Sequence, residues 1–405
     1  MTQTEKTNAF RAFSNKNYAL FFCGQSISQI GTWMQRTAVS WVIYSMTHSA
    51  YMLGLAVFAQ QFPSFLFSLV GGIVSDRYDR RKILLITQTA SLVQSVLLAI
   101  LTFTNHYIVW EILALSVLLG IVNAFDTPAR QPMVHDLVKE KEDITNALAL
   151  NSAMVNIARL IGPALSGIVL QAFGAHTCFT LNAVSFLAVI GSLLMLKLPP
   201  FTPPAVKKKV MTELSEGFVY LRQTPRIAIV IILIMCLGLF VFPYDTLMPV
   251  FAKMIFGGDA RTFGYIASAV GLGSIAGSFF LASLKKSTDL TIVLLSSIVL
   301  LGVGLIGFSR CKSFYWSIPF AIIVGVASLT PATVCITIIQ METATHMRGR
   351  VMSYVAMAYF GMLPLGSLLA GFVSQGITAP TTMFIQGIIA VVTAFIFSRY
   401  LKKKQ

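Results

Sequence analysis

Two arginines stand within long apolar stretches of the sequence, and each belongs to a polar helix face. At 100° per residue, the members of each face fall within about 80° of one another. The first face carries Gln25, Gln29, Trp33 and Arg36, and the second carries Asn156 and Arg159. Guanidinium groups bind anions through charge-assisted hydrogen bonds, and a tryptophan ring can flank a cation. The two faces predict a shared polar cavity that holds an anionic group, unless Arg159 only pairs with a helix carbonyl or an acid.

Asp245 is the acid that lies deepest in the apolar stretches of the second half, where it follows Tyr244. A charge inside a membrane costs roughly 2.5–3.5 kcal/mol on insertion scales, so it needs a partner or a role. We interpret Asp245 as a proton-coupling group near Arg36, with Tyr244 on the cavity wall. The alternative is a structural ion pair near the outer surface.

The sequence lacks the usual groups of membrane enzymes. It contains no P-loop for ATP, no His-Glu-x-x-His motif for zinc and no Gly-x-Ser-x-Gly motif for a nucleophilic serine. Its five cysteines are far apart and form no metal-ligand spacing. We therefore expect no enzymatic activity, no cofactor and no metal.

The elements that carry these residues are predicted to cross a membrane. Hydrophobic residues make up 56% of the chain and charged residues 11%, whereas soluble domains contain roughly 25% charged residues. Apolar stretches of about 20 residues recur without the alternation of barrel strands, which predicts an all-α membrane protein with twelve transmembrane helices. The expected spans are residues 18–44, 50–74, 83–103, 108–130, 144–170, 178–196, 227–251, 262–284, 291–308, 314–339, 351–375 and 383–401.

The distribution of lysine and arginine predicts the orientation of these spans. Basic residues gather in the N-terminal segment, the loop after the second span, the central connector and the C-terminal tail, whereas the opposite loops hold only Lys253, Arg261, Arg310 and Lys312. The positive-inside rule therefore places both termini in the cytoplasm, for which we expect a bacterial inner membrane. The net charge of +15 reports orientation and does not indicate nucleic-acid binding.

A polar connector divides the chain into two similar halves. Residues 197–226 contain prolines and a lysine run, followed by an amphipathic segment at 211–221 that should lie on the inner leaflet. Gly167 recurs as Gly371 and Thr127 recurs as Thr330, at offsets of 204 and 203 residues. This duplication predicts two homologous six-helix bundles, residues 1–196 and 227–405.

The loop after the second span reads Gly72-Ile-Val-Ser-Asp76-Arg77-Tyr-Asp79-Arg80-Arg81, which resembles motif A of the major facilitator superfamily. The resemblance implies a gating role for Gly72, Asp76, Arg77, Arg80 and Arg81. Asp76 would cap a helix of the second half when the cytoplasmic side is closed. Arg80 would pair with an acid at the inner end of the fourth span, for which we expect Asp126. The alternative is an ordinary basic loop.

Asp79 departs from motif A, in which glycine is usual at this position. Aspartate tolerates φ > 0 better than most residues, so a left-handed turn residue is expected there.

The fifth span contains Gly162, Pro163 and Gly167, which are similar to motif C of antiporters and drug exporters in the same superfamily. Proline removes a backbone donor and kinks a helix, and glycine permits close packing, so the motif suits a pivot. A merely structural kink is the alternative. The block Phe125-Asp126-Thr-Pro-Ala-Arg-Gln131 resembles the subgroup that contains the enterobactin exporter and macrolide efflux proteins.

The resemblance implies the major facilitator fold and a secondary active exporter that works by alternating access. Its substrates would be small amphiphilic molecules such as siderophores or macrolide-like drugs. We expect a monomer in the lipid bilayer that uses a proton or other ion gradient as an antiporter and binds no nucleic acid. An uptake carrier or a lysophospholipid flippase would share this fold, and a polytopic membrane enzyme is the more distant alternative.

Overall fold

The computed structural model of the chain describes residues 10–105, 108–138, 141–198, 210–285 and 287–402. Within these residues every long element is a helix, which confirms the predicted all-α class. The first half contains α1 (Lys16–Thr47), α2 (Ala50–Arg77), α3 (Arg80–Thr104), α4 (Val109–Leu137), α5 (Lys141–Phe173) and α6 (Ala175–Met195). After α7 (Val210–Gln223) come α8 (Pro225–Phe240), α10 (Ala260–Ala282), α11 (Leu290–Arg310), α12 (Phe314–Glu342), α13 (Arg348–Ile377) and α14 (Ala379–Lys402).

Eleven stretches of the described chain are helical, long and apolar enough to cross a membrane. The helix α1 is not among them, although its 32 residues span about 48 Å at 1.5 Å per residue. Its polar face lowers its mean hydropathy. The polar residues that predict a binding site on α1 therefore also explain why hydropathy does not identify α1 as a membrane span.

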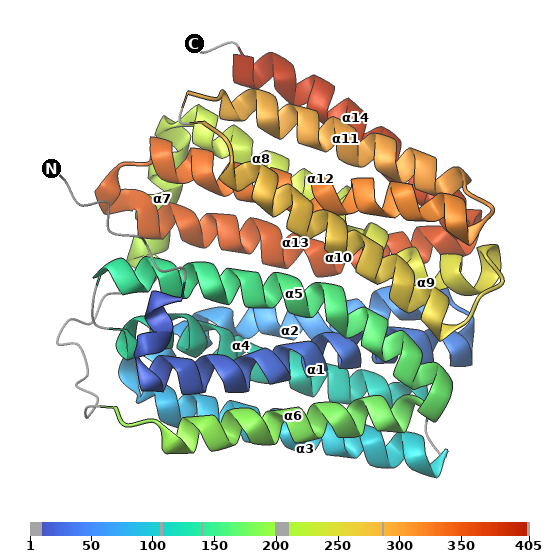
Figure 1. Cartoon of the computed structure of the whole chain (residues 1–405). Coiled ribbons are helices and arrows are strands. Elements are labelled where there is room, and N and C mark those ends of the chain that lie inside the picture. The colour runs from blue at the N-terminus through green and yellow to red at the C-terminus, as the bar shows by residue number, and fades with distance from the viewer. Residues whose placement is uncertain (1–9, 106–107, 139–140, 199–209, 286, 403–405) are drawn as a thin grey trace, which may run out of the picture.

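The helices form two groups that lie against each other (Figure 1). The largest hydrophobic cluster comes almost entirely from residues 221–401, and two smaller clusters come mainly from the first half. Between the groups, α2 packs along α13 and α5 packs along α10. The start of α1 and the end of α14 lie at the same end of the molecule (Figure 1). We call this end the inner end and the opposite end the outer end.

The segment expected as one helix over residues 227–251 is interrupted. The helix α8 ends at Phe240 and is followed by a 3₁₀ turn, η2 (Phe242–Leu247), a single turn, α9 (Met248–Val250), and a π turn, η3 (Phe251–Ile255). Pro243 and Pro249 supply no backbone donor to a regular helix, which explains the change of winding. The expected span is confirmed as the candidate membrane span Pro225–Ile255, but its second half is not a regular α-helix, and Asp245 sits on a tight turn.

Hydrogen bonds between buried polar side chains join α1, α3 and α6 inside the first half. The Gln35 Nε2 donates to the Gln94 Oε1 over 2.9 Å. The Gln35 Oε1 accepts from the Ser95 hydroxyl at 2.6 Å and from the Asn182 Nδ2 at 2.8 Å. In a low-dielectric interior, a fully paired network of this kind rigidifies the helices that it joins. Because Gln35 precedes Arg36, the network also fixes which way the polar face of α1 points.

The helix α7 matches the amphipathic segment expected at 211–221, and it is fastened to the second half. The Arg350 Nη2 lies 2.6 Å from the Glu216 Oε2, and the Tyr220 hydroxyl accepts from the Ala344 N–H over 3.1 Å. Phe218 on another face is 51% exposed. The connector helix α7 is therefore attached to the inner end of the second half.

Candidate functional site

Trp33, Arg36, Arg159 and Asp245 come together between the two halves. The Cζ atoms of Arg36 and Arg159 lie 5.2 Å and 5.0 Å from the centre of the Trp33 ring. The Arg36 Nη2 is 3.9 Å from the Asp245 Oδ2, and these side chains are 34% and 54% exposed. The ion pair therefore lies in a space that water reaches. Groups from α1, α5 and η2 form one cluster with two positive charges, one negative charge and a central tryptophan ring.

Close packing of α5 on α1 holds Trp33 in place. A Cβ at Gly162 would lie 2.5 Å from the Trp33 Cβ, so a larger residue would push the helices apart. One turn further along α5, the Ser166 hydroxyl donates to the Met34 carbonyl over 3.0 Å. On the other side of α5, the Pro163 carbonyl would lie 2.5 Å from a Cβ at Gly264 of α10. The Gly-Pro pair thus positions the tryptophan and also takes part in the contact with the second half.

The other residues expected on the cavity wall differ in exposure. Gln29 and Asn156 are half-buried, and Tyr244 is buried. Gln25 is only 3% exposed, and its Nε2 has no hydrogen-bond partner among the described residues. At this level Gly24 brings α1 close to α6, where a Cβ would lie 2.6 Å from the Ser192 hydroxyl. Gln25 therefore lies within the helix packing, not on an open wall as expected.

Glycine pairs close the contact between the halves at the outer end. A Cβ on Gly264 of α10 would lie 3.1 Å from the Gly167 Cα of α5, and a Cβ on Gly371 of α13 would lie 3.2 Å from the Gly54 Cα of α2. We call the α5/α10 and α2/α13 contacts the two seams. Gly167 and Gly371 are the duplicated glycines of the sequence. The repeated positions therefore build equivalent contacts in the two seams.

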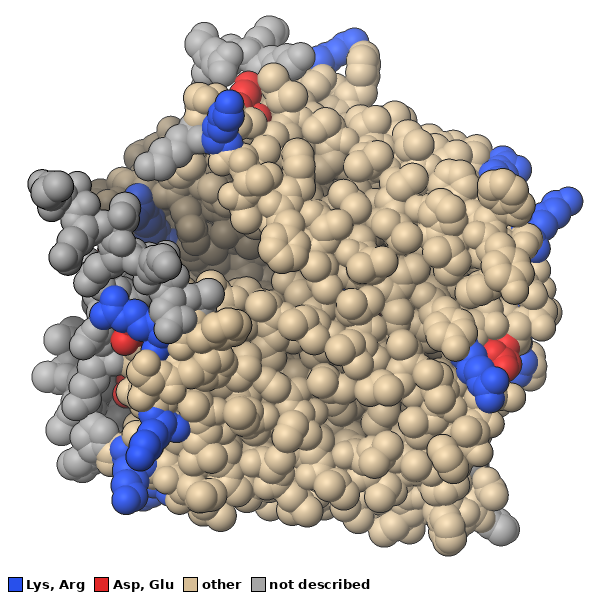
Figure 2. Space-filling view, in the orientation of Figure 1, with Lys and Arg blue, Asp and Glu red and all other residues tan. Residues whose placement is uncertain are grey.

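At the inner end the halves separate. Figure 2 shows a hollow between them at the end where the termini lie, with basic side chains near its rim. Asp76 and Arg77 at the end of α2 are exposed, and nothing lies within 4 Å of a Cβ built on Gly72. Within the described chain, Asp76 forms no hydrogen bond with the second half. The helix-capping contact that the resemblance implied for Asp76 is therefore not formed in this open-inward arrangement.

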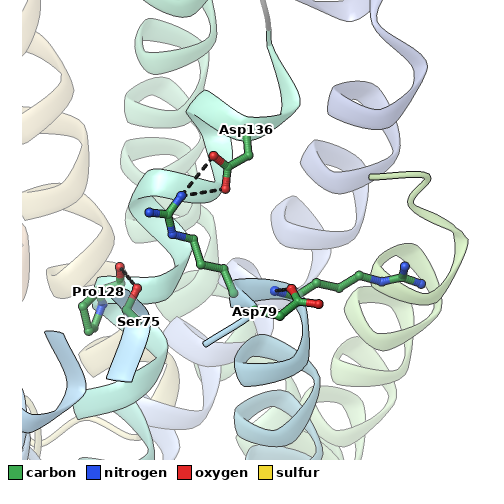
Figure 3. Close-up of polar contacts among 6 residues, drawn as sticks. Ser75, Asp79, Pro128 and Asp136 are labelled. Carbon is green, nitrogen blue, oxygen red and sulfur yellow. Dashed lines mark hydrogen bonds and ion pairs between the residues drawn. The ribbon is translucent and has the colours of Figure 1, made fainter. Parts of the chain in front are cut away.

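The inner ends of α3 and α4 are joined by an ion pair whose acid is not the expected one. The Arg80 Nη1 contacts the Asp136 carboxylate at 2.8 Å and 3.0 Å, as Figure 3 shows. Asp126 was expected as its partner. Ten residues on α4 separate the two acids, about 15 Å along a helix, and only Asp136 lies level with the start of α3.

The start of α3 is also fixed by Asp79 and Arg81. Asp79 has φ −58° and is the N-cap of α3, where its carboxylate accepts from the Arg81 N–H at 2.9 Å (Figure 3). The expected left-handed turn residue is therefore absent, and a capping carboxylate takes the place of the usual glycine. The Arg81 Nη2 donates to the Leu194 carbonyl of α6 over 2.8 Å. Both residues tie the loop to the first half.

Asp126 instead belongs to a buried cluster within the first half. It is 2% exposed and accepts from the Thr87 hydroxyl at 2.9 Å and from the Gln88 Nε2 at 2.7 Å. It also pairs with Arg130 one turn along α4. A buried carboxylate needs such partners, so Asp126 locks α3 to α4. The sequence block 125–131 contained both charges, but its spacing did not reveal the partners from α3.

Comparison with known proteins finds a family model and several related membrane transporters. A family model described as transmembrane secretion effector matches residues 7–404. The staphyloferrin A transporter of Staphylococcus aureus is 29% identical over 392 residues, which cover 95% of this chain and 97% of the relative. Macrolide efflux protein A of Streptococcus pyogenes is 21% identical, with 93% of both chains covered. The enterobactin exporter EntS of Salmonella typhimurium is 26% identical, with 82% of this chain and 79% of the relative covered.

Solved structures show the same fold. A bacterial homologue of the human lysosomal transporter Spinster, in an inward-facing and unoccupied conformation, superposes with a TM-score of 0.76 at 13% identity. The superposition covers 96% of this chain and 98% of that chain. The nucleoside transporter NupG superposes with a TM-score of 0.75 at 15% identity, over 96% of this chain and the whole of the other. At these identities the likeness concerns the arrangement of helices.

Proposed function

The chain belongs to the transmembrane secretion effector family of major facilitator transporters, and we propose that it exports small anionic amphiphiles such as siderophores. The protein is a membrane transporter and not an enzyme. The observation that carries the proposal is the cluster in which Trp33 lies against Arg36 and Arg159, in a space that water reaches. Two guanidinium groups beside an aromatic ring suit a ligand that is both anionic and flat.

We propose twelve transmembrane helices in two six-helix bundles, residues 1–196 and 227–405, with both termini in the cytoplasm. The proposal adds α1 to the eleven helices identified by hydropathy, because α1 has 32 residues and packs along α5 and α6. The common end of the first and last helices supports an even number of crossings (Figure 1). The Lys and Arg distribution supports a cytoplasmic inner end in the bacterial inner membrane.

Transport is proposed to proceed by alternating access. In the open-inward arrangement the glycine pairs of both seams are in contact at the outer end, while Asp76 at the inner end is free of the second half. Rocking the halves would separate Gly167 from Gly264 and Gly54 from Gly371. The same motion would bring the motif A loop against the second half and close the cytoplasmic side.

Asp245 is proposed to couple export to proton influx. Antiport requires that the proton and the substrate exclude each other at the site. A substrate whose hydroxyl groups donate to ionised Asp245, while its anionic group binds Arg36 and Arg159, meets this requirement. Protonation removes the negative charge that strengthens those hydrogen bonds and turns one carboxyl oxygen into a donor, so it weakens substrate binding. Hydroxycarboxylates and catechols carry both kinds of group. The Arg36–Asp245 pair is long, at 3.9 Å, and both side chains are partly exposed, which favours its replacement by such a ligand.

Transport by inside-out membrane vesicles tests the proposal. Energised vesicles would be offered staphyloferrin A, enterobactin and a macrolide, and uptake would be compared between the wild type and Arg36→Ala/Arg159→Ala. Loss of two charge-assisted contacts, at about 1.5–3 kcal/mol each, should lower anion transport at least about 100-fold. Arg36→Lys/Arg159→Lys keeps the charges and serves as the matched control, with partial activity expected. Undiminished transport by the double alanine variant would refute the anion site.

A further inference from the structure

The α2/α13 seam opens at a definite level, as the residues along one face of α2 show. Positions 54, 65, 68 and 72 share a face within about 60° at 100° per residue. Gly54 touches Gly371, and a Cβ on Gly361 would lie 3.0 Å from the Phe65 ring. Ser68 is exposed, and Gly72 faces open space. The face that meets α13 at the outer end is therefore uncovered beyond Phe65.

The facing side of α13 changes at the same level. Gly371, Ser367 and Pro364 on this side are buried, whereas Phe360 and Met357 further inward are 57% and 39% exposed. Both walls of the seam thus lose their partner at the level of Phe65 and Gly361. The inner halves of α2 and α13 therefore do not cover each other, and we call this uncovered stretch of the seam the slit.

Aromatic rings line the route from this slit to the charged cluster. On α2, the Phe58 and Phe62 rings stack at 4.6 Å, and the Phe65 ring follows at 6.1 Å. On α13, the Tyr359 and Phe360 rings meet edge-on at 5.2 Å, and the Tyr359 ring lies 5.9 Å from the ring of Phe242. Because Phe242 belongs to η2, the aromatic residues beside the slit extend to the turn that carries Asp245.

The α5 wall of the α5/α10 seam carries different side chains. It continues inward from Leu160 through Asn156, Ala153 and Ala149, of which the two alanines are exposed. These side chains are small or polar. The α5 surface that continues inward from Arg159 is therefore small or polar, whereas the α13 surface at Phe360 is aromatic.

We propose that the inner slit of α2/α13 is a lateral window through which the apolar part of the substrate enters the cavity directly from the inner leaflet. The inference rests on the proposed function and adds the route and the substrate class, an aromatic or alkyl anion that partitions into membranes. An apolar group that passes from lipid to the aromatic lining avoids exposure to water, while its charged end travels along the open inner side to Arg36 and Arg159.

Photocrosslinking in lipid nanodiscs tests the window. A benzoylphenylalanine is placed at Phe360 in one protein and, as a matched control, at Val93 in another, since Val93 is 50% exposed on α3, away from both seams. The probe is 1-anilinonaphthalene-8-sulfonate, an aromatic anion that enters membranes. We expect lipid adducts at both positions, and saturating probe should lower those at Phe360 about tenfold while leaving those at Val93 unchanged.

Two results would overturn the window. One is the absence of lipid adducts at Phe360, which would mean a closed slit. The other is a set of lipid adducts at Phe360 that the probe does not reduce. Repeating the assay with Arg36→Ala/Arg159→Ala separates this inference from the proposed function. Protection of Phe360 that is as strong in that variant as in the wild type would keep the window and count against the arginine site.

Discussion

The two seams between the halves are alike where they close and unlike where they open. At the outer end, duplicated glycines Gly167 and Gly371 make equivalent contacts with α10 and α2. At the inner end, the α2/α13 seam exposes Phe360 and Met357, whereas the α5 wall of the other seam exposes Ala153 and Ala149. Under the proposed alternating access, the glycine contacts that would move are alike in the two seams, whereas the exposed inner residues differ. We therefore expect mutations to affect closure and recognition separately.

Removing the buried carboxylate of Asp126 should have the largest effect, a loss of stability. The comparison of the two seams assumes that each half moves as a rigid unit, and Asp126 joins two helices of the first half. Asp126→Ala strips Thr87, Gln88 and Arg130 of their acceptor, and breaking a buried ion pair costs about 3–5 kcal/mol. Asp136→Ala, the control, removes a 42% exposed partner of Arg80 and should cost at most about 1 kcal/mol. Thermal unfolding of the purified variants measures both. Equal losses would show that the buried cluster does not fasten the first half.

Bulky residues at the duplicated glycines should block the moving contact in either seam. A Cβ at Gly167 would lie 2.7 Å from the Ala260 carbonyl, and one at Gly371 would lie 2.5 Å from the Ala50 carbonyl. Overpacking costs up to about 3 kcal/mol, so Gly167→Leu and Gly371→Leu should each lower vesicle transport about 100-fold. Gly191→Leu on α6 is the control, since a Cβ there meets nothing within 4 Å. A strong loss of transport in only one of the two glycine variants would show that the two seams are not equivalent.

Changing the lining should alter selectivity and leave closure intact. Phe360→Ala removes an exposed ring from the aromatic side, and an aromatic contact is worth about 0.5–1.5 kcal/mol, so the KM of an aromatic substrate should rise roughly threefold to tenfold. Asn156→Ala on the polar side should leave that KM nearly constant. Transport of paired substrates with and without an aromatic group measures the difference. Equal changes in KM for the two variants would mean that Phe360 does not contact the aromatic part of the substrate as proposed.

The charged cluster could be predicted from the sequence because it depends on helix periodicity and on the cost of charge in a membrane. Trp33, Arg36 and Arg159 needed only the 100° rotation per residue and a common cavity. The partner of Arg80 could not be predicted in this way. Its identity depends on which turn of α4 stands level with the start of α3, and sequence position does not record that offset.

Other features escaped prediction because they depend on packing between distant helices. Gln35 forms a network with Gln94 and Asn182, and the sequence shows only isolated amides on three apolar stretches. The opening of the seams beyond Phe65 depends on the tilt of whole bundles. Gln25 shares the polar face of α1 with Arg36, yet it is buried because α1 and α6 converge at its level.

The Arg36–Asp245 pair is proposed to join substrate binding to the proton gradient. Proteoliposomes with Asp245→Asn test it most directly, by comparing uphill accumulation under a pH gradient with exchange of labelled for unlabelled substrate at equal pH. We predict that accumulation falls to the equilibrium level while exchange continues, because the amide keeps a hydrogen-bond acceptor but cannot bind a proton. Uphill accumulation with unchanged dependence on the pH gradient would contradict it.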